Sequence, residues 1–125
     1  MKVLDTSVAV DHLRGFEPAV ALLTRLTVDD VPLVASEVVR FELLSGVREG
    51  EIEQLELFCS SLSWIPINEE VTRTAGALAR LHRKANRGIG TADYIIAATA
   101  GILGAELLTL NVRHFPMVPD LQPAY

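Results

Sequence analysis

Cysteine, long apolar runs and surplus positive charge are all scarce in this sequence of 125 residues. The single cysteine, Cys59, cannot form an intramolecular disulfide, which is typical of a protein from a reducing cytoplasm. The most apolar run, Tyr94–Leu103, is too short to span a bilayer and predicts a buried helix. Asp5 and Asp11 interrupt the apolar N-terminal stretch, which argues against a secretory signal. We therefore expect one cytoplasmic domain over residues 1–125, with no membrane contact.

The formal net charge of −5 argues against a protein that coats nucleic acid by bulk attraction. The charge is uneven, because residues 1–72 hold 5 Lys or Arg against 13 Asp or Glu, and residues 73–125 hold 6 against 3. Basic side chains lie on one face of a predicted helix and just beyond it, namely Arg73, Arg80, Lys84 and Arg87. That face is either a solvated surface or a binding site for RNA phosphates.

Short apolar segments alternate with longer helical patterns along the whole chain. Strands are predicted at 2–5, 33–35, 64–67 and 107–110, with 117–118 a candidate for one more, and Pro66 indicates that 64–67 is short or at an edge. Helices are predicted at 6–14, 17–27, 37–48, 51–62, 69–86 and 92–103. The strands are apolar without alternating polarity, which favours a parallel sheet covered on both faces. We expect an α/β fold with three layers, α/β/α, around a mostly parallel sheet.

Three carboxylates, those of Asp5, Glu42 and Asp93, fall just after predicted strands or in the first turns of helices, and Asn111 follows another strand. In such sheets the functional crevice lies beyond the carboxyl ends of the strands, so we expect these side chains in one crevice. Clustered carboxylates repel one another, and a hard divalent cation such as Mg²⁺ relieves that repulsion with oxygen ligands. The three histidines lack the spacing of a zinc site.

Each carboxylate also has a purely structural interpretation. Asp5 at a strand-to-helix junction is a good helix cap, and Asp93 suits the positive end of a helix dipole. Glu42 lies on a nearly apolar helix, where either a buried ion pair, for example with an arginine, or a position near the rim of the helix would explain it. The combination of the three acids in one crevice favours a shared site over three separate structural roles.

The sequence resembles the PIN-domain nucleases, and most closely the VapC-type toxins of bacterial VapBC toxin–antitoxin pairs. The resemblance spans nearly the whole chain in four motifs: VLDTSVAVDHLRG, ASEVVRFELLSGV, IGTADYIIAATA and LLTLNVRHF. It implies a PIN-like α/β/α fold, dependence on Mg²⁺ or Mn²⁺, a homodimer, RNA as substrate and a cognate antitoxin as partner. It maps the acidic set of the family onto Asp5, Glu42 and Asp93.

The last motif departs from members that carry further acid there. This chain has Asn111, and His114 stands where an aspartate is often found. Asn111 adds no charge, although it can orient a water or a ligand, so a second metal ion is not implied.

The predicted reaction is hydrolysis of a phosphodiester bond. Asp5 and Asp93 would hold the metal, with Glu42 as a ligand or as base for the attacking water. Thr6, Ser7 and Asn111 would orient these groups by hydrogen bonds. A structured RNA such as tRNA or ribosomal RNA is the expected substrate, because sequence-specific cleavage generally uses unstacked loop bases. Its cleavage would block translation.

Two other functions stay open from the residues alone. A phosphatase could use Asp5 as its nucleophile, although that class needs a second acid two residues on, where this chain has Ser7. A non-catalytic RNA-binding or regulatory protein would show no metal dependence and would tolerate the loss of any one acid.

Overall fold

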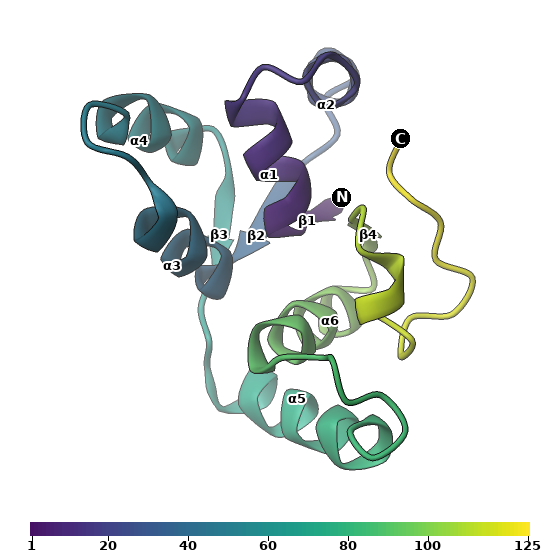
Figure 1. Cartoon of the computed structure of the whole chain (residues 1–125). Coiled ribbons are helices and arrows are strands. Elements are labelled where there is room, and N and C mark those ends of the chain that lie inside the picture. Colours follow the sequence, from purple (N-terminus) through teal and green to yellow (C-terminus); the bar gives the residue numbers. More distant parts are fainter.

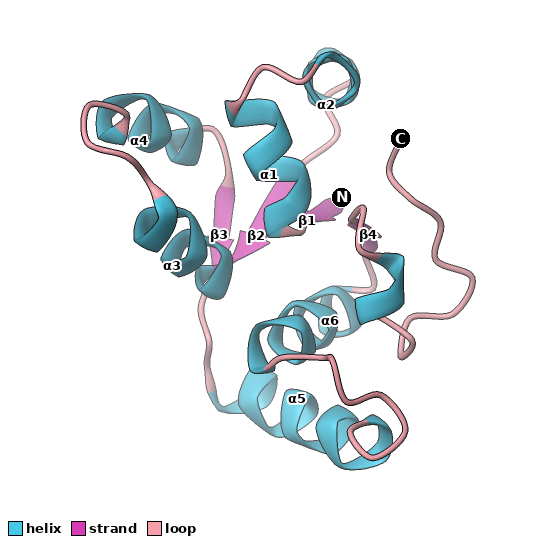
Figure 2. Cartoon of the chain, viewed as in Figure 1, coloured by secondary structure: helices cyan, strands magenta, loops and turns pink.

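A computed structural model describes all residues, 1–125, as a central sheet with helices on both faces (Figures 1 and 2). The strands are β1 (Lys2–Leu4), β2 (Leu33–Ser36), β3 (Ser63–Ile65) and β4 (Glu106–Leu108). The helices are α1 (Thr6–Leu13), α2 (Glu17–Val28), α3 (Glu37–Gly46), α4 (Ile52–Ser60), α5 (Glu69–His82) and α6 (Thr91–Leu103), and a 3₁₀ turn, η1, covers Val112–His114. The helices lack the length and apolar character that a membrane span requires.

The sheet is entirely parallel, in the order β3-β2-β1-β4, with Val3 paired to Val34 on one side and to Leu107 on the other. Right-handed crossovers from β1 to β2 and from β2 to β3 run toward one edge, so α1–α4 fall on one face. The crossover from β3 to β4 runs the opposite way and brings α5 and α6 to the other face (Figure 1). The predicted three-layer α/β/α fold is confirmed.

The predicted strand at Met117–Val118 is wrong. The amide of Val118 donates to the carbonyl oxygen of Phe115 in a turn (3.0 Å), and Pro116 and Pro119 flank the pair without amide donors for a sheet. The interpretation of Pro66 is confirmed, because β3 ends at Ile65 and lies at the edge of the sheet. Helix α5 also ends at His82 rather than near Asn86, so Lys84 and Arg87 follow the helix in turns.

The core fills both faces of the sheet. The larger cluster joins β1, β2 and β4 to α1–α4 and α6, and a smaller one joins α5 to α6 around Tyr94. Phe115, which follows η1, is 1% exposed and belongs to the larger cluster. The segment after β4 is thereby fixed to the body of the domain at the end of the sheet where Asn111 lies.

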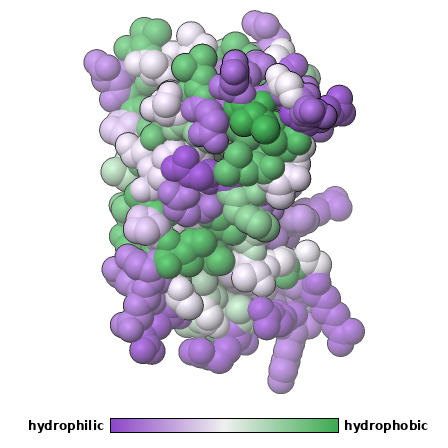
Figure 3. All heavy atoms as spheres, turned by 90° about the vertical axis from the view of Figure 1, so that its left-hand side faces the viewer, coloured by the Kyte–Doolittle hydropathy of each residue, from purple (hydrophilic) through white to green (hydrophobic).

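Helix α3 is less covered than its apolar composition indicates. Only Val39 and Leu43 are fully buried on it, whereas Phe41 is 70% exposed and Leu44 is also exposed. The side of the molecule that carries α3 and α4 shows apolar patches among polar side chains (Figure 3). An uncovered apolar face of this kind is typical of a protein–protein interface.

We predict that Phe115→Ala lowers the free energy of unfolding by about 3–5 kcal/mol, the usual cost of truncating a buried phenylalanine. Chemical denaturation followed by circular dichroism measures it. Leu57→Ala is the control, because Leu57 is 73% exposed on α4 and its truncation should change stability by no more than about 0.5 kcal/mol. If Phe115→Ala fails to fold, the milder Phe115→Leu gives the measurement. Equal stability of the Phe115 and Leu57 variants would contradict the packing described.

Candidate active site

The site is built where the parallel strands end. Asp5 directly follows β1, which lies between β2 and β4 in the sheet. Helix α3 follows β2 without a break and carries Glu42 in its second turn. Thr109 and Asn111 come just after β4, and Asp93 lies in the first turn of α6. Because the strands run in the same direction, these segments meet at one edge of the sheet, as predicted.

Asp5 is held by hydroxyl groups rather than by helix amides. It is 4% exposed, and although it occupies the N-cap position of α1, its side chain makes no cap hydrogen bond. Its Oδ2 accepts hydrogen bonds from Ser7 Oγ (2.8 Å) and from Thr109 Oγ1 (2.6 Å). Those hydroxyl oxygens accept in turn from the amides of Leu110 (3.1 Å) and Asn111 (2.9 Å). The network joins β1, α1 and the segment after β4 through one carboxylate oxygen.

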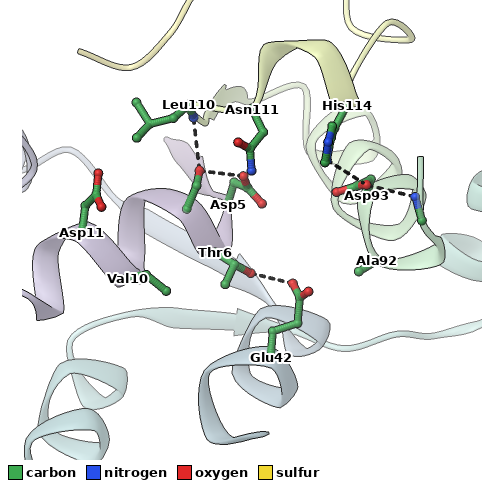
Figure 4. Close-up of a pocket in the computed structure, with 12 residues that line it drawn as sticks. Asp5, Thr6, Val10, Asp11, Glu42, Ala92, Asp93, Leu110, Asn111 and His114 are labelled. Atoms are coloured by element: carbon green, nitrogen blue, oxygen red, sulfur yellow. Dashed lines mark hydrogen bonds and ion pairs between the residues drawn. The ribbon is translucent and has the colours of Figure 1, made fainter. Parts of the chain in front are cut away.

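Glu42 has no basic partner, so the predicted alternative of a buried ion pair with an arginine is not what the structure contains. Its Oε1 accepts a hydrogen bond from Thr6 Oγ1 (2.6 Å), the first residue of α1. The side chain is half-buried, and it enters the cavity from the side of α3 (Figure 4). One carboxylate oxygen is thus oriented by Thr6, and Oε2 has no hydrogen-bond partner.

Asp93 combines the structural role with a place in the cavity. Its Oδ2 accepts from the amide of Gly90 (3.1 Å), which caps the start of α6, and lies 3.4 Å from Nδ1 of His114. Burial raises the pKa of Asp93, and the charge of Asp5 raises it further, whereas the Gly90 amide and His114 lower it. Asp5 and Asp93 line the same cavity, where their like charges repel each other.

These side chains surround one cavity of about 480 Å³ (Figure 4). No lysine or arginine lines it, so its charge is strongly negative. Asp5, Glu42 and Asp93 approach it from three different elements. The residues that line it are Asp5, Thr6, Ser7, Val10, Asp11, Glu42, Gly90, Ala92, Asp93, Leu110, Asn111 and His114.

The donor set fits a hard divalent cation by its chemistry, because it offers carboxylate, hydroxyl and amide oxygens and no thiolate. No three carboxylate, imidazole or thiol side chains, however, are grouped closely enough to hold one ion by themselves. That spacing suits Mg²⁺, which keeps several waters and usually takes only one or two carboxylates directly. Asp5 and Asp93 are the pair whose charges interact, and they would hold such an ion.

Sequence reasoning missed two members of the site and left a third without a role. Thr109 is fully buried and supports Asp5, and the sequence hid it because it falls inside the strand predicted at 107–110, whereas β4 ends at Leu108. Asp11 lines the cavity from α1 and accepts a hydrogen bond from the hydroxyl of Tyr125 (2.7 Å). His114 contacts Asp93 and lines the cavity, although the sequence assigned it no role.

The basic residues predicted to bind RNA do not line this cavity. Arg73 forms an exposed ion pair with Glu69 (3.5 Å) at the start of α5. Arg80 and Lys84 are exposed at and beyond the end of that helix, and Arg87 is exposed in the turn that precedes Gly90. Any contribution of these side chains to binding would therefore be made outside the acidic cavity.

Comparison with known proteins gives the chain clear relatives. The family model described as PIN domain matches residues 2–120. Ribonuclease VapC19 of Mycobacterium tuberculosis is 54% identical over 125 residues, which is the whole of both chains. Among solved structures, VapBC-1 from nontypeable Haemophilus influenzae is 30% identical with a TM-score of 0.76, covering 97% of this chain and 94% of that one. VapBC2 from Rickettsia felis, bound to a DNA fragment from their promoter, is 27% identical with a TM-score of 0.77, covering 96% and 94%.

We predict that Asp93→Asn raises the melting temperature by a few degrees in EDTA. A carboxyl whose pKa is higher in the folded than in the unfolded state destabilises the folded protein above that pKa, so removing its charge stabilises. The gain should shrink as the pH falls through the raised pKa of Asp93, where the wild type becomes protonated.

Thermal unfolding of the wild type and of Asp93→Asn, each in EDTA and in Mg²⁺, provides the measurement. Mg²⁺ should raise the melting temperature of the wild type more than that of the variant, because it binds the folded state preferentially. If Asp93 acts only at the helix terminus, the variant melts lower than the wild type in EDTA and Mg²⁺ shifts neither.

Proposed function

This chain belongs to the PIN-domain family, and on that premise we propose that it is a metal-dependent endoribonuclease, the toxin of a toxin–antitoxin pair. The observation that carries the proposal is the cavity at the strand ends, where Asp5, Glu42 and Asp93 meet without any lysine or arginine. The full-length similarity to Ribonuclease VapC19 supports RNA cleavage as the reaction.

In the proposed mechanism Asp5 and Asp93 would hold Mg²⁺, or Mn²⁺ as a substitute, which would supply Lewis-acid activation of the phosphate and of the attacking water. Asp5 Oδ2 is occupied by Ser7 and Thr109, and Asp93 Oδ2 by Gly90 and His114, so Oδ1 is the oxygen that each carboxylate has left for a ligand. The hydroxyl and amide donors thereby fix the orientation of both carboxylates before any ligand binds.

Glu42 accepts the proton of the attacking water. Thr6 holds Oε1, which leaves Oε2 as the free base on the cavity side of α3. As the water oxygen bonds to phosphorus, the bond from phosphorus to the leaving ribose oxygen breaks, and that oxygen takes a proton from solvent. Asn111 follows β4 at the cavity wall and can donate its side-chain amide to a phosphate oxygen.

The proposed substrate is a structured RNA with an unpaired loop, such as tRNA or ribosomal RNA, and its cleavage would stop translation. The cavity is open at the surface and lined by few apolar residues, so it suits an exposed phosphodiester better than a buried small molecule. An enzyme with this action belongs in the cytoplasm, where such RNAs occur.

The proposed partners are a cognate antitoxin and a second copy of this chain. The solved structures similar to this chain include VapBC assemblies from Haemophilus influenzae and Rickettsia felis. The exposed apolar side chains Phe41 and Leu44 of α3 and Leu81 of α5 offer surface for such contacts. An arginine or lysine of the antitoxin could neutralise the acidic cavity in place of the metal.

We predict that Asp5→Ala, Glu42→Ala and Asp93→Ala each remove RNA cleavage while the fold survives. Loss of the general base alone should slow cleavage by about 10²–10⁴-fold. Cleavage of total RNA in Mg²⁺ and in EDTA provides the measurement, with circular dichroism as the check on folding. Glu53→Ala, an exposed acid on α4 outside the cavity, is the matched control.

Expression of the wild type without its antitoxin should arrest growth, and the alanine variants should not. A variant that cleaves at the wild-type rate would remove its residue from the site. Cleavage that persists in EDTA would contradict metal dependence, and RNA binding without cleavage by the wild type would favour a non-catalytic RNA-binding protein.

We further predict that charge reversal at Arg80 and Lys84 weakens RNA binding similarly for all sequences and leaves Mg²⁺ affinity unchanged. Both side chains are exposed at or just beyond the end of α5, outside the cavity. Because phosphate contacts make RNA binding depend on salt, a variant that loses them should show a weaker salt dependence. Fluorescence anisotropy over a salt series and calorimetric titration with Mg²⁺ measure the two properties. Unchanged RNA affinity and salt slope would make this surface a solvated one.

A further inference from the structure

A second groove adjoins the acidic cavity on the side of α1, α3 and α4. It has a volume of about 660 Å³, and it shares Val10 and Glu42 with the cavity, so the two adjoin each other. Its walls come from the end of α1, the end of α3 and the start of α4. We refer to it as the α1–α4 groove.

The α1–α4 groove carries the cations that the acidic cavity lacks. Arg14, just after α1, and Arg48, just after α3, both line it. Both are exposed, and neither forms a salt bridge, in contrast to Arg40 and Arg73, which pair with neighbouring glutamates. The groove also contains Glu42 and Glu51, so its formal charges balance, but the two guanidinium groups have no carboxylate partner within ion-pair distance.

We propose that the α1–α4 groove binds the single-stranded RNA segment that flanks the cleaved phosphodiester, with Arg14 and Arg48 holding its phosphates. The inference rests on the proposed ribonuclease function and extends it to a second part of the substrate. Guanidinium groups bind phosphate oxygens through paired hydrogen bonds, and free arginines are the ones available to do so. The volume lies within the ~300–1,000 Å³ that encloses small ligands, so a nucleotide fits.

Adjacency to the catalytic carboxylates is the reason to place RNA here. A polynucleotide whose scissile phosphate lies at Asp5 and Asp93 would enter this groove where it continues past Glu42, which lines both the cavity and the groove. The residues that line the groove include Gln54, Leu13 and Leu55 but no aromatic side chain. Binding should therefore depend on phosphate charge and tolerate any base, because no ring is available for stacking.

The first experiment measures the contribution of the two arginines to RNA binding. Wild type, Arg14→Gln, Arg48→Gln and the double variant are titrated into a labelled single-stranded RNA of about 12 nucleotides, in EDTA to prevent cleavage. Each lost phosphate contact should reduce the slope of log K against log salt concentration by about 0.7, and the double variant should bind about tenfold more weakly at low salt. Arg25→Gln is the matched control, an exposed arginine of α2 outside the groove and without a salt bridge.

The second experiment fills the groove without changing its charge. Gly46, the last residue of α3, lines the groove, and a Cβ added there meets no atom within 4 Å. Gly46→Leu should therefore fold and weaken RNA binding by obstruction. Gly101→Leu on α6 is the control, because Gly101 is exposed, has equal space for a Cβ and lies outside the groove.

The third experiment separates this inference from the proposed function. In Mg²⁺, Arg14→Gln/Arg48→Gln should raise the KM for a cleaved RNA and leave kcat near the wild-type value, since the groove binds substrate and transition state equally. The same comparison is made with two shortened RNAs, one lacking the nucleotides on one side of the cleavage site and one lacking those on the other side. The KM should depend on the arginines for only one of the two, the RNA that keeps the segment bound in the groove.

If the wild type cleaves RNA and the arginine variants keep the wild-type KM and salt slope, the inference is wrong and the proposed function is unaffected. Absence of both RNA cleavage and RNA binding by the wild type overturns the two together. If the arginine variants bind RNA normally but are no longer inhibited by the antitoxin, the groove belongs to the protein partner and the inference is wrong.

Discussion

The hydrogen bonds of hydroxyl groups to one buried carboxylate oxygen are the interaction on which the site depends. Asp5 is almost fully buried at the end of the central strand, where an unpaired negative charge would be very costly. Ser7 and Thr109 donate hydrogen bonds to Oδ2, and both hydroxyl oxygens also accept hydrogen bonds from backbone amides of the segment after β4. The carboxylate and the loop that carries Asn111 therefore hold each other in place.

The same arrangement explains how charge is divided over the molecule. Carboxylates are gathered in a cavity without lysine or arginine, and arginines without a salt bridge lie beyond the end of α5 and in the adjoining groove, where Glu42 and Glu51 also lie. A protein with net charge −5 can still bind a polyanion if a metal neutralises the negative charge at the place where the chemistry occurs. The proposed function and the proposed RNA groove both follow from that separation.

The structural alternatives for the three acids were decided by contacts that no residue pattern specifies. Asp5 has the position of a helix cap but not its hydrogen bond, and Glu42 pairs with the hydroxyl of Thr6 instead of with an arginine. Asp93 does cap its helix through Gly90, so for this residue the structural role and a place in the cavity coexist. A helix-capping role for a residue in a crevice at the strand ends therefore does not argue against a functional role for the same residue.

The sequence by itself determined the parallel α/β fold and the gathering of Asp5, Glu42 and Asp93, because apolar strand segments and polar residues just beyond them are local features. It failed at Met117–Val118, where two prolines and a turn outweigh two apolar side chains. Only the tertiary structure decided that Thr109 supports Asp5, 104 positions away, and that Arg14 and Arg48, 34 positions apart, line one groove. Residues so far apart in sequence meet only when helices and strands pack. Local patterns encode elements, whereas long-range contacts arise from their packing.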